Sequence, residues 1–217
     1  MSCDLINRDA SYHAQLIRRC FSAADPEKPH LTRIGGIPTA EAALVSHLIP
    51  SDQIPAAVLV PIVDRPEGLT LLMTQRSSRL RTHAGQISFP GGRIEPKDGG
   101  PKAAALRETE EEIGLSGDQI EIVGQLSSHC VFSGFAVTPV IGLIKPDFSL
   151  SVDSREVESV FEVPLSYVLN PNNQQLEQRT VGECSVSVYF FQYGYRRIWG
   201  LTAGIIMHLH ERLRAES

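Results

Sequence analysis

Apolar residues gather in short runs through the middle and the C-terminal part of the chain, and turn-forming residues separate these runs. Runs of about four to eight apolar and β-branched residues, bounded by Gly, Pro, Asn or Asp, are typical of β-strands. The first two runs flank a short polar turn at 64–68, which predicts that they pair antiparallel. The predicted strands cover residues 54–63, 69–74, 86–90, 119–126, 136–144 and 185–191.

Helical spacing, with apolar residues three or four positions apart, marks several segments around these strands. One further helix is expected to begin near Pro101, because proline is favoured in a first helical turn, and to end at Gly114 in a left-handed cap. The other predicted helices cover residues 11–24, 39–48, 165–169 and 202–213.

The order of these elements predicts an α/β protein. Strands on both sides of a short helix, followed by a closing helix, indicate an α/β/α sandwich around a mixed β-sheet. Residues 1–50 hold two of the predicted helices and are interpreted as a helical N-terminal extension, and residues 51–217 as the main domain. At 217 residues the chain is long enough to bury a substantial core.

Composition and charge narrow the class of partner. The chain is 42 % hydrophobic with a net charge of −5 and no Lys/Arg run, so a nucleic-acid partner is not expected. No apolar stretch approaches the ~18 residues of a membrane span, and the N-terminus lacks the pattern of a signal peptide. The four cysteines form no Cys-x-x-Cys pair and are interpreted as reduced thiols. We therefore expect a cytoplasmic protein with no membrane partner.

The predicted helix at 101–114 carries four carboxylates within five residues. Glu108, Glu111 and Glu112 stand at i, i+3 and i+4 and share one face, whereas Glu110 points elsewhere. Like charges at these spacings destabilise an isolated helix by about 0.2–0.5 kcal/mol per pair. A hard divalent cation would turn that repulsion into coordination, because Mg²⁺ prefers oxygen ligands. A solvated acidic face is the alternative, and a neighbouring glycine pair and arginine favour the metal site.

At these positions the chain resembles the Nudix hydrolases, whose box reads G-x5-E-x7-R-E-U-x-E-E-x-G-U, with U a bulky apolar residue. The first acid is Asp98 rather than glutamate, and eight residues instead of seven separate it from Arg107. Thr109 stands where the first bulky apolar residue is expected. The matching positions are Gly92, Arg107, Glu108, Glu111, Glu112, Gly114 and Leu115.

The resemblance implies a Nudix fold and metal-dependent hydrolysis of a diphosphate linked to another group. It implies that Mg²⁺ or Mn²⁺ is bound by the three glutamates of the shared face and by a backbone carbonyl of the glycine turn, assigned to Gly92. Gly91 is expected to contact the substrate. Glu108 and Glu111 are expected to act in catalysis, and Arg107, Asp98 and Gly114 to have structural roles in the site.

The stretch before the box narrows the expected substrate. It is similar to the motif L-L-T-x-R-[SA]-x3-R-x3-G-x3-F-P-G-G of the coenzyme A pyrophosphatase branch, with Met73 as the sole departure. That resemblance implies cleavage of coenzyme A or its derivatives to 3′,5′-ADP and 4′-phosphopantetheine. Coenzyme A also carries a 3′-phosphate, and Arg76 and Arg81 are predicted to bind phosphate oxygens.

Two alternatives remain open for the function. A Nudix pyrophosphatase for ADP-ribose, NADH or another nucleoside diphosphate derivative would share the chemistry. A non-catalytic Nudix-fold protein that only binds its ligand would share the fold.

The proton acceptor for the attacking water is likewise open between a box glutamate and an acid of the predicted loop at 156–162. Glu156 is placed ahead of Glu158 and Glu162 because it matches a position where the coenzyme A branch carries an acid. The aromatic residues near Trp199 are interpreted as core or dimer contacts, so a homodimer is also left open.

Overall fold

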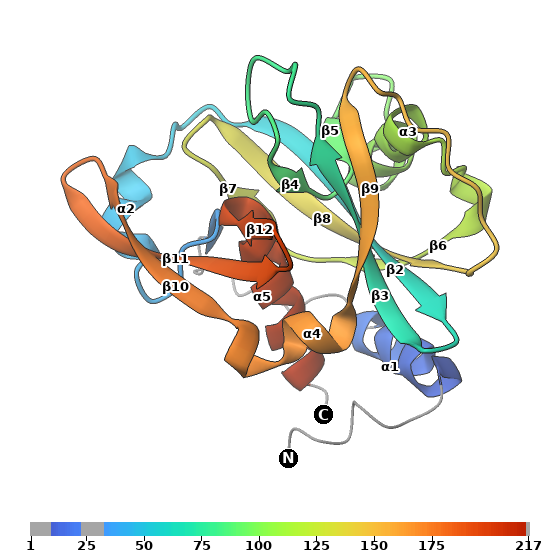
Figure 1. The fold of residues 1–217 in the computed structure, drawn as a ribbon. Coiled ribbons are helices and arrows are strands. Elements are labelled where there is room, and N and C mark those ends of the chain that lie inside the picture. The colour runs from blue at the N-terminus through green and yellow to red at the C-terminus, as the bar shows by residue number, and fades with distance from the viewer. Residues whose placement is uncertain (1–9, 23–32, 216–217) are drawn as a thin grey trace.

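The centre of the computed structural model, which describes residues 10–22 and 33–215, is a nine-stranded mixed sheet (Figure 1). The long strand β2 (Ile54–Arg65) runs through its middle. It pairs in parallel with β8 (Phe135–Ile144) and antiparallel with β3 (Gly68–Arg76). The predicted antiparallel pair across the turn at 64–68 is therefore confirmed.

Shorter strands extend this sheet on both sides. On one side, β3 also pairs with β9 (Val157–Pro164) and with β4 (Ile87–Ser88). On the other side, β8 pairs with β6 (Ile120–Gln125) and β7 (His129–Cys130), and β7 pairs in parallel with β1 (Arg33–Ile34). The short strand β5 (Gly91–Arg93) pairs with the N-terminal half of β2.

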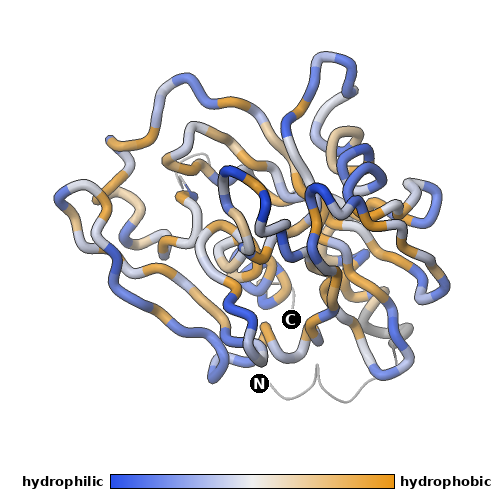
Figure 2. Tube along the Cα trace, turned by 45° about the horizontal axis from the view of Figure 1, so that its top comes forward, coloured by the Kyte–Doolittle hydropathy of each residue, from blue (hydrophilic) through white to orange (hydrophobic). Residues whose placement is uncertain are grey.

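The alternation of side chains along β2 fills a separate core on each face of the sheet. Ala57, Leu59 and Val63 pack on one face, under helix α3 (Pro101–Ile113). Val60 and Ile62 pack on the other face, against α1 (Ala10–Ser22), α4 (Leu165–Leu169) and α5 (Gly200–Ala215). Figure 2 shows the apolar positions concentrated in the central strands and the polar ones in the outer turns. Helices on both faces of a mixed sheet confirm the predicted fold class.

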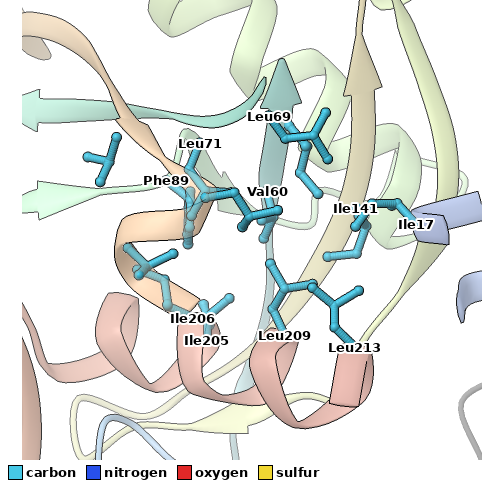
Figure 3. Packing of buried hydrophobic residues seen from close by; sticks show 14 of the residues in the cluster. Ile17, Val60, Leu69, Leu71, Phe89, Ile141, Ile205, Ile206, Leu209 and Leu213 are labelled. Atoms are coloured by element: carbon cyan, nitrogen blue, oxygen red, sulfur yellow. The ribbon is translucent and has the colours of Figure 1, made fainter. Parts of the chain in front are cut away.

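Helix α1, in the predicted N-terminal extension, shares the second of these cores. Ile17 belongs to one cluster with Ile141, Leu209 and Leu213, and Figure 3 shows these side chains between α1, the sheet and α5. The same predicted extension contains the strand β1, so its described part is not purely helical. The domain boundary near residue 50 stays a prediction.

A second sheet of three strands lies beside the first one (Figure 1). It consists of β10 (Gln175–Val181), β11 (Cys184–Tyr193) and β12 (Arg196–Trp199), all antiparallel. The short helix α2 (Ala42–Val45) and the 3₁₀ turn η1 (Ser46–Leu48) replace the longer helix predicted at 39–48. Two further 3₁₀ turns are η2 (Gly117–Gln119) and η3 (Pro171–Asn173). Within the described ranges, no helix has the length and apolar character needed to cross a membrane.

The prediction of a loop before residue 162 was also wrong. The segment at 156–162 was predicted to be a loop, but residues from Val157 onward form β9, which pairs with β3 over most of its length. Val157 and Val160 pack against the core under α3, and Phe161 and Val163 pack against the core on the other face of the sheet, so both faces of the strand contribute to packing. Its partner strand is far away in sequence, and this pairing was not visible locally.

Candidate active site

Helix α3 is held against the sheet by its small and apolar face. Ala104, Ala105 and Ile113 are fully buried, and they belong to the core that includes β2. Pro101 occupies the first turn, and Gly114 ends the helix in the left-handed conformation with φ 70°. Both predicted helix ends are therefore confirmed. The acidic residues lie in the second half of this helix.

The glycine pair of β5 brings the backbone very close to this helix. A Cβ on Gly91 would lie 2.3 Å from the carbonyl oxygen of Ala57 on β2. A Cβ on Gly92 would lie 2.5 Å from the carboxyl group of Glu108. Only glycine leaves room for that approach, which explains why the turn and the helical carboxylate can occupy one site.

Glu112 is buried beneath this turn with only 4 % of its surface exposed. Burial raises its pKa to about 8, and the negative charges of Glu156 and Glu108 act in the same direction. Arg76 and a hydrogen bond from the backbone N–H of Gly91 oppose the rise in pKa. The sequence had indicated a carbonyl at this turn, and the N–H contact to Glu112 was missed because spacing alone does not show which backbone group faces the helix.

Glu108, one turn earlier, is part of the same cluster. Burial raises its pKa above the usual value, and the guanidinium of Arg107 works against that rise. The nearby charges of Glu111 and Glu156 raise it further. Burial and mutual repulsion disfavour the ionised forms of Glu108 and Glu112. A bound divalent cation would stabilise these ionised carboxylates.

Arg107 links the helix to the loop that precedes it. Its Nε and Nη2 donate 3.0 Å hydrogen bonds to the two carboxylate oxygens of Asp98. Its Nη1 donates to Glu108 at 2.9 Å and to Glu111 at 3.0 Å, and Nη2 also donates to the carbonyl of Arg93. The forked contact holds the pKa of Asp98 at about 2, well below its usual value.

The departures from the Nudix box have local structural explanations. The side chain of Asp98 still meets Arg107 through two hydrogen bonds, although it is shorter than glutamate and one residue farther along the chain. Thr109 is fully buried at the position of an apolar residue, and its hydroxyl donates to the carbonyl of Ala105 at 2.6 Å. That bond satisfies the only polar group which the substitution adds to the core.

Not all of the predicted metal ligands converge. Glu111 is exposed and turned to Arg107, whereas Glu108 and Glu112 face the glycine turn. In the described part of the chain, no three acidic, histidine or cysteine side chains already stand in positions to hold a metal ion. The donor set of carboxylates beside a backbone turn fits a hard divalent cation.

The segment before the box meets the site at Arg76, the last residue of β3. Its charge acts on Glu112, and its Nε is buried without a hydrogen-bond partner among the described residues. Backbone bonds from Arg76 N to Gln86 O and from Gly85 N to Arg76 O close the loop that follows. Arg81 lies in this loop and is exposed, so the structure does not bring it to the carboxylates.

The three candidate base residues on β9 and its preceding turn lie in different surroundings. Glu156 acts electrostatically on both Glu108 and Glu112, and its carbonyl accepts from Ser77 N at 2.8 Å. Glu158 is exposed at a bulge in the pairing with β3. Glu162 is bound by Arg65, with an Nη2–Oε1 distance of 2.6 Å, and by the hydroxyl of Thr70, so it is committed to a structural contact.

Comparison with known proteins places these features in a family. A family profile described as "NUDIX domain" matches residues 53–184, more than half of the chain. The chain is similar to the "Uncharacterized Nudix hydrolase NudL" of Photorhabdus laumondii, with 43 % identity over 73 % of this chain and 84 % of that protein. The protein of the same name from Escherichia coli K12 is 44 % identical over 71 % of this chain and 80 % of its own length.

Among solved structures, the MutT/nudix family protein from Enterococcus faecalis has 17 % identity and a TM-score of 0.48, and the match covers 81 % of this chain and 69 % of that one. The profile match and the two relatives at more than 40 % identity show the family. This chain belongs to the Nudix hydrolases, and it is an enzyme of the pyrophosphohydrolase type that defines them.

Proposed function

We propose that this Nudix hydrolase cleaves the diphosphate bond of coenzyme A or its derivatives, giving 3′,5′-ADP and 4′-phosphopantetheine. The observation that supports the proposal is the electrostatic proximity of the stretch before the box to the carboxylate cluster. Arg76, which matches a fixed position of the coenzyme A motif, lies near enough to Glu112 for its charge to oppose the rise in the pKa of that carboxyl group. The segment that resembles the coenzyme A branch thus borders the reacting centre.

The proposed roles follow from charge and position. Glu108, Glu111, Glu112 and the Gly92 carbonyl would hold Mg²⁺ or Mn²⁺, which would neutralise the charge of the diphosphate oxygens. Gly91 is proposed to contact the substrate through its backbone, and the absence of a side chain there lets β5 lie against the backbone of β2. Arg107, fixed by Asp98, keeps the helical glutamates in place, and catalysis rests on positioning and charge stabilisation.

Product identity is the direct test of the substrate. Incubation with coenzyme A and Mg²⁺ is expected to give two products with the masses of 3′,5′-ADP and 4′-phosphopantetheine. Parallel reactions with ADP-ribose and NADH test the same-class alternative, and a higher kcat/KM for either would replace coenzyme A as the substrate. Binding of coenzyme A without any metal-dependent product would support the non-catalytic alternative.

Arg81 is proposed to recognise the 3′-phosphate, since Arg76 lies near the carboxylates of the proposed metal site and Arg81 is exposed on the adjoining loop. The wild-type enzyme is expected to prefer coenzyme A over 3′-dephospho-coenzyme A in kcat/KM. A charge-assisted hydrogen bond contributes about 1.5–3 kcal/mol, so the preference should be roughly 10- to 150-fold. Arg81→Ala should abolish it.

Arg79→Ala is the matched control for that measurement. Arg79 is exposed on the same loop but occupies a variable position of the motif, so its loss should leave the preference unchanged. A wild-type enzyme that is indifferent to the 3′-phosphate would contradict the proposed recognition and favour ADP-ribose.

Glu156 is proposed as the general base, because it is the acid of β9 and its preceding turn that acts on both helical glutamates. Glu156→Gln is expected to lower kcat by about 10²–10⁴-fold at neutral pH, the usual contribution of general base catalysis. The deficit should shrink at high pH, where hydroxide needs no base. Metal affinity should remain near that of the wild type.

Glu158→Gln, two residues away and exposed at the bulge, is the control and should keep its turnover. If Glu156→Gln retains near-normal turnover at neutral pH, the role of base returns to the glutamates of the helix.

A further inference from the structure

The strand β10 has an open edge. It pairs with β11 on one side, and no described strand lies on its other side. Figure 1 shows β10 on the outer side of its hairpin, away from the nine-stranded sheet. Five of its seven residues are exposed. A strand of this length with a free edge is a template for pairing with another chain.

The backbone groups on this edge can be identified from the contacts of β11. The N–H of Tyr189 donates to Gly36 O at 2.9 Å, and the N–H of Ser187 donates to Glu41 at 2.7 Å. Both N–H groups therefore point away from β10, although Tyr189 is opposite Leu176 and Ser187 is opposite Gln178.

Pairs of this kind in an antiparallel ladder are not hydrogen-bonded to each other, so their N–H and C=O groups point outward on both strands. Leu176 and Gln178 consequently direct their backbone N–H and C=O groups away from β11. The direction alternates from one residue to the next along a strand, so the backbone groups of Thr180 also point away from β11. The open edge thus offers three evenly placed residues for a new ladder.

Opposite charges flank the centre of this edge. Glu177 and Arg179 stand on either side of Gln178 and share one face of the strand. The Nε of Arg179 donates to Glu177 at 2.8 Å, and Arg197 on β12 also forms an ion pair with Glu177. Half of the Arg179 side chain remains exposed, so it can reach a partner strand.

We propose that two copies of this chain associate through β10, antiparallel about a two-fold axis at Gln178. In this register Leu176, Gln178 and Thr180 all form hydrogen-bonded pairs with the other copy. Glu177 then lies directly opposite the partner subunit's Arg179, in the closer non-hydrogen-bonded pair, and the reverse contact is made by symmetry. The two hairpins join into one continuous six-stranded sheet.

Charge selects this register over its neighbours. Moving the axis to residue 177 sets Glu177 opposite the partner's Glu177, and moving it to residue 179 sets Arg179 opposite the partner's Arg179. Like charges directly opposite each other destabilise a strand pair. The register centred on Gln178 also pairs all seven residues of β10, whereas any other two-fold register pairs fewer.

Charge reversal tests the proposed pairing in solution. Sedimentation velocity of the full chain should show the wild type approaching twice the monomer mass as its concentration rises. Glu177→Arg alone and Arg179→Glu alone should each remain monomeric, because each sets like charges opposite each other. The double variant should dimerise again, and a mixture of the two single variants should form a heterodimer, since their charges are complementary.

Arg197→Ala is the control for lost contacts within one hairpin, and it should leave the dimer intact. A wild type that stays monomeric at every concentration, or single variants that dimerise as well as the wild type, would overturn the proposal.

A cysteine pair tests the register itself. The Cα atoms of a hydrogen-bonded antiparallel pair are about 5.5 Å apart, within the ~4.4–6.8 Å that a disulfide spans. Gln178→Cys should therefore cross-link two copies under mild oxidation. Thr180→Cys should not, because its equivalents lie four residues apart along the strand, about 13 Å. Equal cross-linking of both variants, or of neither, would refute this register.

Discussion

Glu112→Gln should lower turnover at least about 10²-fold, the scale seen when a preorganised charge-stabilising group is removed. The substitution keeps the size of the side chain and removes the charge of a residue that is 4 % exposed and faces Glu108, Glu156 and Arg76. Steady-state kinetics with saturating Mg²⁺ measures the effect. A variant with near-normal turnover would show that Glu112 is not part of the reacting centre.

Glu110→Gln is the matched control for this experiment. Glu110 is exposed on another face of α3 and should tolerate the same change with little loss. Equal losses in both variants would contradict the helical geometry of the site.

The stability of the Glu112 variant separates catalytic from structural damage. Because the folded-state pKa of Glu112 is raised from 4.5 to about 8, the folded protein holds a proton that the unfolded chain releases between these values. The metal-free wild type should therefore lose stability as pH rises from about 4.5 to 8. Glu112→Gln should weaken that dependence and should not lower the melting temperature at neutral pH.

Gly204→Ala should destabilise the fold by about 1–3 kcal/mol, the typical cost of an overpacked core. In an exposed helix interior the same change would stabilise by roughly 0.5–1 kcal/mol. In α5, however, the new Cβ would lie 2.0 Å from the carbonyl oxygen of Gly35, and a backbone carbonyl cannot turn aside as a flexible side chain does. Steric overlap therefore outweighs helix propensity at this position.

Chemical denaturation at constant pH measures this change in the free energy of unfolding. Gly99→Ala is the control, since a Cβ there meets no atom within 4 Å, and it should alter stability little. A Gly204→Ala variant as stable as the wild type would mean that α5 and the turn at Gly35 do not pack this closely in solution.

The predicted elements that were confirmed have strong local signals. The strands β2, β3 and β8 are long apolar runs, and α3 carries its own start and stop signals in Pro101 and Gly114. The strand β10 was missed because both of its faces are largely exposed, so no periodicity of burial marks it. It forms because β11 pairs with it across a tight turn, where Gly182 has φ 60°.

For the site, the sequence by itself determined the chemistry. The spacing of Glu108, Glu111 and Glu112 on one helical face, together with the glycine pair before the helix, predicts a hard-cation site without reference to any distant residue. The diphosphate chemistry is what the resemblance to the Nudix box implies. Such local patterns can be recognised in the sequence because helical periodicity and glycine geometry depend on only a few neighbouring residues.

Only the tertiary structure decided which of these groups meet. Burial under the turn separates Glu112, with its raised pKa, from the exposed Glu111. The pairing of β9 with β3 brings Glu156 close enough to influence the carboxylate cluster electrostatically. Glu162, on β9, forms an ion pair with Arg65 instead. Desolvation and charge interactions depend on distances between segments that are remote in sequence, and chain folding alone sets those distances.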